Sequence, residues 1–220
     1  MAKKPLGNIK TIIFDLDGTL IDAYSAIESS FNFTMRKLGL PTQKKTIIRK
    51  AVGWGDGMLL APFVPKSILP SALNIYRQHH KKSLVAKAKL FPAAINLLRK
   101  FSKKYYLAVA SNRPTKFSNI LLKSLKLNKY FDFIICADKL KKGKPHPLIL
   151  QKIIKKLKVK PKEALFVGDM AIDAQTAKRA RVKAIIVRTG SSSLEEIRKE
   201  RPYKIISSIK ELEDYLKTNK

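Results

Sequence analysis

The chain has 220 residues, 45% of them apolar, which fits one α/β domain with a smaller insertion and a core large enough to fold without disulfides. One cysteine and three histidines exclude an intrachain disulfide and argue against a zinc cluster, and no apolar run approaches the roughly 18 residues of a membrane span. The formal net charge of +30, from 46 Lys and Arg against 16 Asp and Glu, points to an anionic partner.

The first expected strand, residues 9–14, ends directly before Asp15-Leu16-Asp17-Gly18-Thr19. Side chains alternate along extended backbone, so Asp15 and Asp17 are expected to point the same way. Two carboxylates this close repel each other unless a cation or a shared proton relieves the repulsion. Taken alone, the run is explained equally well by a turn that begins with Asp and uses Gly for its backbone freedom.

Residues 22 to about 88 contain no good strand pattern but several helical ones. Apolar residues at helical spacing run from 26 to 38, from 47 to 51 and from 68 to 79. His79 and His80 are interpreted as solvated helix surface. Because this all-helical segment follows the first strand, we expect a cap domain at 22–88 over the sheet edge that holds Asp15, and a core domain at 1–21 and 89–220.

Beyond this segment, strand and helix patterns alternate along the chain. Apolar runs predict strands at 106–110, 133–137, 164–167 and 184–187, with a further strand-like piece at 204–207. Helical stripes are found at 91–101, 117–125, 148–157, 174–180 and 209–216. This alternation predicts an α/β fold, a Rossmann-like parallel sheet with helices on both faces. Cys136, inside an apolar run, is expected in the core.

Polar motifs follow three of these later strands, where ligands bind in open α/β sheets. They are Ser111-Asn112-Arg113, Lys144-Pro145, and Gly168-Asp169 with Asp173 four residues further on. With Asp15 and Asp17 they supply two acidic pairs, a hydroxyl and a cation, a set that would hold Mg²⁺ by oxygen ligands and a phosphate by Lys and N–H groups. Arg113 itself is interpreted as a helix-start residue before Pro114.

In this order, the four motifs resemble those of the haloacid dehalogenase-like phosphohydrolases. Within that family the chain looks most like the phosphoglycolate phosphatases, through Val52-Gly53-Trp54-Gly55, Lys144-Pro145-His146-Pro147 and the segment 164–169. The resemblance covers nearly the whole chain, since the helical segment occupies the place of the family's first type of cap. It implies a Rossmann-like core with a helical cap.

The resemblance also implies roles for individual residues. Asp15 would be the nucleophile that forms an aspartyl-phosphate, Asp17 the general acid and base, and Lys144 a cation beside the reacting phosphate. Mg²⁺ would be bound at a site made by Asp15, the backbone carbonyl of Asp17, Asp169 and, in a supporting place, Asp173. The phosphate would be bound by Gly18, Thr19, Ser111, Asn112 and Lys144.

The implied function is Mg²⁺-dependent hydrolysis of a small phosphorylated metabolite, such as phosphoglycolate. Asp17 favours this over dehalogenation, because a phosphate ester's leaving oxygen needs a proton and a halide does not. A pyrophosphatase, a nucleotidase and a β-phosphoglucomutase-type enzyme on the same core remain open.

A basic nucleic-acid-binding module is a distant alternative that rests on the charge alone. Lysines are scattered over nearly every expected helix, mostly without aromatic neighbours that could stack on bases, which argues against specific nucleic-acid binding. Residues 1–5 lack the apolar segment of a signal peptide, so we expect a cytoplasmic protein with no membrane partner. Monomer and homodimer are both left open.

Overall fold

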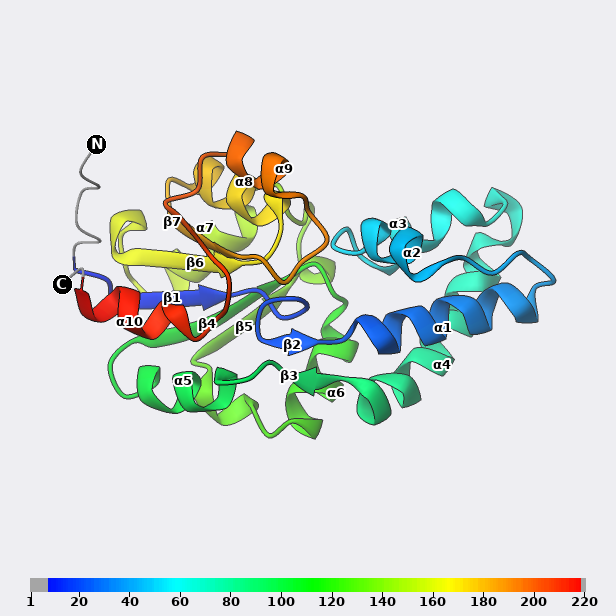
Figure 1. Cartoon of the computed structure of the whole chain (residues 1–220), viewed down its shortest axis with the longest axis horizontal. Helices are drawn as coiled ribbons and strands as arrows, with labels where there is room; N and C mark the ends of the chain where they lie inside the picture. Colours follow the sequence, from blue (N-terminus) through cyan, green and yellow to red (C-terminus); the bar gives the residue numbers. More distant parts are fainter. Residues whose placement is uncertain (1–7, 219–220) are drawn as a thin grey trace.

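The structure is a computed structural model that describes residues 8–218. The expectation that residues 1–5 are not part of a signal peptide lies outside these residues. A parallel sheet forms its centre (Figure 1). The strands stand in the order β5-β4-β1-β6-β7-β8, and every neighbouring pair is parallel. Their bounds are β1 Thr11–Phe14, β4 Tyr106–Ser111, β5 Phe133–Cys136, β6 Ala164–Gly168, β7 Lys183–Val187 and β8 Lys204–Ile206.

The central strands are apolar on both faces. In β1, Ile12 and Phe14 belong to one core cluster while Ile13 belongs to the other, and all three are fully buried. In β6, Leu165 belongs to the first of these clusters and Phe166 to the second. Parallel strands covered by helices on both sides require such a continuous apolar pattern. The predicted Rossmann-like α/β sheet, with strands at each expected place, is confirmed.

Helices cover both faces of this sheet. One face is packed by α5 (Ala94–Phe101), α6 (Thr115–Ser124) and α10 (Glu211–Thr218). The other is packed by α7 (Leu148–Lys156), α8 (Ala171–Ala180) and α9 (Leu194–Lys199). Short 3₁₀ turns lie at Ala61–Phe63, Lys66–Ile68, Asn128–Tyr130, Ala137–Lys139 and Pro161–Glu163.

One of these helices, α9, was missed in the sequence. It begins with a capping box in which Ser193 and Glu196 bond each other's backbone N–H groups, a signal that the sequence does carry. Cys136 is buried in the core, as expected. Among the described residues, no helix combines the length and apolar content needed to cross a membrane.

Residues 23–88, called the helical insert from here on, lie beyond the carboxyl ends of the strands (Figure 1). The insert consists of α1 (Tyr24–Lys37), α2 (Lys45–Ala51), α3 (Asp56–Leu60) and α4 (Leu69–Lys87). The chain enters and leaves it through an antiparallel pair, β2 (Ile21–Asp22) and β3 (Lys89–Leu90). A strand of two residues is too short to show an alternation of apolar and polar side chains, so no strand is predicted here from the sequence. The division into a core domain and a cap domain stays a prediction.

Candidate active site

The residues singled out in the sequence gather at the carboxyl edge of the sheet. Asp15 directly follows β1, Ser111 ends β4, Asp169 directly follows β6, and Lys144 lies in the loop after β5. All four are buried. Because β4, β1 and β6 are parallel neighbours, their ends lie side by side, as expected for a ligand site in an open α/β sheet.

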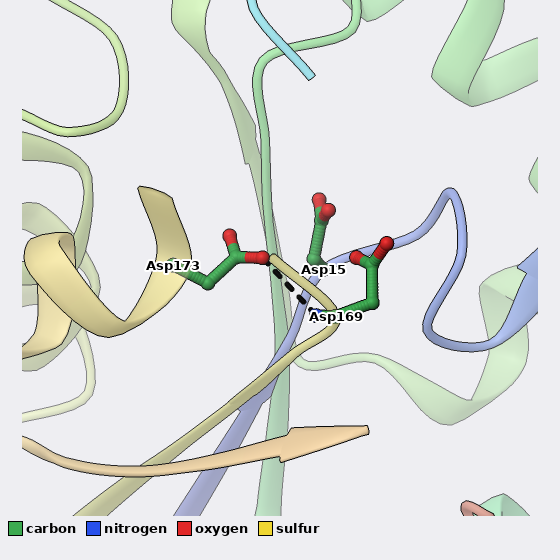
Figure 2. Close-up of side chains that lie close together, drawn as sticks. All are labelled: Asp15, Asp169 and Asp173. Atoms are coloured by element: carbon green, nitrogen blue, oxygen red, sulfur yellow. Dashed lines mark hydrogen bonds between the residues drawn. The ribbon is translucent and has the colours of Figure 1, made fainter. Parts of the chain in front are cut away.

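Three carboxylates form a buried cluster at this edge. Figure 2 shows Asp15, Asp169 and Asp173 around the ends of β1 and β6, and each offers an oxygen within 4.8 Å of the others. Burial raises the pKa of Asp15 to about 7; the Lys144 ammonium lowers it, and the Asp173 and Asp17 carboxylates raise it. Burial, Asp173 and Asp15 likewise raise the pKa of Asp169 well above its usual range. The cluster therefore holds more negative charge than its surroundings stabilise.

Lys144 is the buried cation of this cluster. Its Nζ lies 2.7 Å from Oδ1 of Asp173, which accepts a hydrogen bond, and 3.0 Å from Oδ1 of Asp15 as an ion pair. Burial opposes the charge of the ammonium, but the two carboxylates outweigh it and hold the pKa of Lys144 above its ordinary value. One ammonium faces three carboxylates, so a further cation would neutralise the rest.

The donor set fits a divalent metal ion. Oδ2 of Asp169 is buried and accepts no hydrogen bond from the described residues, and Oδ1 of Asp15 is buried with the Lys144 ammonium 3.0 Å away. A Cβ atom would lie 2.0 Å from Oδ2 of Asp169 if placed on Gly18, and 2.3 Å from it on Gly190, so both glycines leave this oxygen room. Carboxylate oxygens are the ligands that Mg²⁺ takes in proteins.

Asp173 has a different position in the cluster. Its Oδ1 accepts from Lys144, and its Oδ2 accepts from the backbone N–H groups of Asp169 and Met170, at 3.1 Å each. Gly168 leaves space for this side chain, because a Cβ there would lie 2.4 Å from it. Asp173 thus fixes both Lys144 and the loop that carries Asp169.

Asp17 does not join the cluster of carboxylates. Its two oxygens accept hydrogen bonds from Arg113, at 2.8 Å from Nε and 2.5 Å from Nη2. Arg113 is buried, and its Nη1 lies 2.9 Å from Nε2 of His80. Arg113 does lie just before the start of α6, as interpreted from the sequence, but it also binds Asp17, which was not predicted.

The interpretation of His80 as solvated surface is wrong, because its exposed fraction is 2%. The face of α4 that carries it packs against α6, so this end of the helix is covered. Sequence reasoning missed the pair because Arg113 and His80 meet only through tertiary packing. One clue was available in the sequence: an Asp17 carboxylate close to Asp15 requires a positively charged partner of its own, in addition to Lys144.

The remaining predicted residues shape the loops around the cluster. Thr19 donates a 3.1 Å hydrogen bond to Oδ1 of Asp169, and the backbone N–H of Arg113 donates to Oγ of Ser111 at 3.2 Å. The Asn112 side chain donates to the carbonyls of Gly53 (2.9 Å) and Lys144 (3.0 Å) and accepts from the Lys144 N–H (2.8 Å). Asn112 therefore joins the helical insert to the loop that carries Lys144.

Sequence reasoning also missed the loop after β7. The Thr189 hydroxyl donates to the carbonyl of Gly18, and Gly190 lies against Asp169. The run Thr189-Gly190-Ser191 follows a strand end, as the recognised motifs do, so the same rule would have pointed to it.

The helical insert closes over this edge and leaves a cavity of about 60 Å³. One side is formed by the core residues Asp15, Asp17, Ser111, Asn112, Arg113 and Lys144, and the other by residues of the insert that include Ile27, Val52, Leu59, Tyr76 and His80. One water needs roughly 10–15 Å³ in this measure, so the cavity has room for a few waters or a small molecule, and it is partly open to solvent.

Comparison with known proteins decides the family. The family described as "Haloacid dehalogenase-like hydrolase" matches residues 12–187. The chain belongs to the haloacid dehalogenase-like hydrolases. It is 30% identical over 183 residues to a phosphoglycolate phosphatase of Aquifex aeolicus, covering 83% of this chain and 86% of that protein. It is 28% identical over 212 residues to phosphoglycolate phosphatase 1 of Pseudomonas aeruginosa, covering 92% and 78%.

A solved structure agrees with this membership. A haloacid dehalogenase-like family hydrolase of Streptococcus pneumoniae superposes with a TM-score of 0.86 at 27% identity, covering 94% of this chain and 98% of that one. The resemblance stated from the sequence motifs is confirmed, and with it the prediction of an enzyme, a phosphatase of the haloacid dehalogenase-like type. The roles assigned to individual site residues stay predictions.

Proposed function

We propose that this phosphatase depends on Mg²⁺ and hydrolyses a small phosphorylated metabolite through an aspartyl-phosphate on Asp15. One observation carries the proposal. The Asp15 carboxylate lines the cavity between the sheet edge and the helical insert, beside the buried Lys144 ammonium. The same cluster of carboxylates contains an Asp169 oxygen that accepts no hydrogen bond from the described residues. The proposed nucleophile, phosphate-binding cation and metal ligand would therefore lie close together.

The first step would form the covalent enzyme. An oxygen of Asp15 attacks phosphorus, the bond from phosphorus to the leaving oxygen breaks, and Asp17 gives that oxygen a proton. Mg²⁺ held by Asp15 and Asp169 would supply positive charge that lets the anionic nucleophile approach the anionic phosphate.

The second step would release phosphate. Asp17 takes a proton from water, the water oxygen bonds to phosphorus, and the bond from phosphorus to Asp15 breaks. Lys144, the Ser111 hydroxyl and the backbone N–H of Asn112 would hold the phosphoryl oxygens through both steps.

The substrate we propose is phosphoglycolate or a compound of similar size. The cavity has a small volume of about 60 Å³, and the chain is similar over most of its length to proteins named phosphoglycolate phosphatase. The insert covers the cavity with apolar side chains such as Ile27, Val52 and Leu59, which would limit the access of bulk water to the aspartyl-phosphate.

Phosphate release from a panel of phosphorylated metabolites and pyrophosphate tests this proposal. Each compound is assayed with Mg²⁺ and with a chelator, and the proposal expects chelator-sensitive release that is fastest with phosphoglycolate. Faster release from pyrophosphate or a nucleotide would move the assignment to those substrates. Transfer of phosphate between sugar phosphates with little free phosphate would contradict a hydrolase.

A further inference from the structure

The Asp17 carboxylate is held from one side by a planar, two-pronged donor. Arg113 reaches it with Nε and Nη2, at 2.8 and 2.5 Å, and the Arg113 side chain is itself buried. A guanidinium that bonds both oxygens of a carboxylate fixes its orientation as well as its charge. Each Asp17 oxygen keeps a lone pair that can accept a proton from another donor.

His80 fixes Arg113 in turn. Arginine carries only donors, so Nη1 donates to Nε2 of His80, 2.9 Å away, and the His80 proton must lie on Nδ1. Nδ1 then donates to Oγ of Ser30 at 3.1 Å, and the Ser30 hydroxyl donates to the carbonyl of Ala26 at 2.8 Å. Burial and the Arg113 charge lower the pKa of His80 to about 2, which keeps the imidazole neutral and able to accept.

The line of hydrogen bonds crosses from the helical insert to the core. Ser30 lies in α1 and His80 in α4, whereas Arg113 follows β4 and Asp17 follows β1. The His80 ring is held by stacking on Tyr76, at 4.8 Å between centroids, and by the edge-on ring of Phe117 at 5.3 Å. The insert thus sets the place of His80, and His80 sets the place of Arg113.

We propose that Arg113 is a positioning residue for the second step of the reaction, and that His80 ties its position to the helical insert. The inference rests on the function proposed above. In the observed arrangement both Asp17 oxygens are acceptors, the form that takes a proton from water while the water oxygen bonds to phosphorus and the bond to Asp15 breaks. Without the fork, Asp17 can rotate away from the water.

The proposal predicts a specific kinetic change in Arg113→Met. We expect phosphate release from Asp15 to become slower and kcat to fall by about 10–100-fold, because a misplaced general base loses only part of its rate enhancement. KM falls in parallel, because kcat/KM reports the earlier step that forms the aspartyl-phosphate. With p-nitrophenyl phosphate as the probe, a burst of p-nitrophenolate approaching one equivalent per chain is expected.

Three further variants complete the test. His80→Phe keeps the stacked ring but removes the Nε2 atom that accepts from Arg113. We expect it to show the same burst and the same parallel fall of kcat and KM, but with smaller changes than Arg113→Met. It replaces Arg113→Met in the test if that variant fails to fold. Arg113→Lys restores the charge without the fork and is expected to recover part of kcat. The matched control is Arg77→Met, which removes a second forked pair, to Asp56 at 2.7 and 3.1 Å. Arg77 is exposed and Asp56 lines the insert side of the cavity, so this variant controls for the loss of a forked arginine that does not reach Asp17.

The outcomes separate the two proposals. A burst with parallel loss of kcat and KM in Arg113→Met or His80→Phe, absent in Arg77→Met, supports the inference. Folded variants that lose kcat/KM with no burst, or that keep wild-type kinetics, overturn the inference alone. Wild-type protein that releases neither p-nitrophenolate nor phosphate overturns the proposed function and this inference with it.

Discussion

Gly18 and Asp169 share a space that leaves no room for another side chain. A Cβ on Gly18 would lie 2.0 Å from Oδ2 of Asp169, and Gly18 has φ of +80°, where L side chains are strained. The first and fourth sequence motifs therefore meet in direct contact. The Asp169 oxygen involved is the one that accepts no hydrogen bond from the described residues.

Replacing this glycine should disturb the proposed metal site. Gly18→Ala adds both backbone strain and a collision with Asp169, so we expect it to abolish the rise in melting temperature that Mg²⁺ gives the wild type. Gly39→Ala is the control, because Gly39 has φ of +66° and nothing within 4 Å of an added Cβ. It should cost about 1–2 kcal/mol of stability from strain alone and keep the response to Mg²⁺. Equal responses of the two variants would contradict the assignment.

Removing the buried ammonium should affect both stability and turnover. Lys144→Met leaves Asp15 and Asp173 without their cation, and we expect the free energy of unfolding to fall by about 3–5 kcal/mol when a chelator is present. Phosphate release should slow by about 10²–10³-fold, as when a preorganised donor to the transition state is lost. Lys100→Met is the control, since Lys100 pairs with Glu213 on the surface and such pairs contribute about 0–1 kcal/mol.

His80 should make stability depend on pH. Its pKa is about 2 in the folded protein and 6.5 in the unfolded chain, so the unfolded state binds the extra proton below pH 6.5. The stabilisation that comes from keeping His80 neutral is therefore complete above pH 6.5 and falls as pH drops, by at most about 1.4 kcal/mol per pH unit. Urea unfolding between pH 4.5 and 7.5 should show a shallower decline for His80→Phe. The same slope in both proteins would mean that His80 is accessible and charged.

Asn112 should matter as a link between two loops. Asn112→Asp keeps the shape but cannot donate to the carbonyls of Gly53 and Lys144, so we expect a loss of about 1–3 kcal/mol in stability and a higher KM. Asn32→Asp loses a similar bond, the donation to the carbonyl of Gln43 within the insert, and should destabilise the protein without changing KM. If KM changes in neither variant, or equally in both, the hydrogen bonds of Asn112 do not influence substrate binding as we expect.

The sheet could be predicted because its strands are buried on both faces and read as continuous apolar runs. The helices on it carry clear stripes of buried residues. The pair β2 and β3 could not be predicted, since two residues such as Ile21 and Asp22 show no periodicity. The helix α9 has only one fully buried apolar side chain, Ile197, and its signal was a cap instead of a stripe.

The gathering of Asp15, Ser111 and Asp169 was predictable because the ends of neighbouring parallel strands must lie together. The partner of Asp17 was not, because it depends on which face of α4 the packing turns toward Arg113. The hydrogen-bond partners of the Asn112 side chain were not predictable either, since Gly53 and Lys144 are distant from it in the sequence. The expectations of a cytoplasmic location and of a monomer or homodimer stay predictions.

Phosphate release by Asp15→Asn is the decisive measurement for Asp15 as the nucleophile. Wild type and variant are assayed side by side with Mg²⁺ and phosphoglycolate, with the melting temperature of each measured in the same buffer. We expect the variant to stay folded and to release no phosphate above background, since an amide cannot form the aspartyl-phosphate. A folded Asp15→Asn protein with turnover near that of the wild type would contradict it.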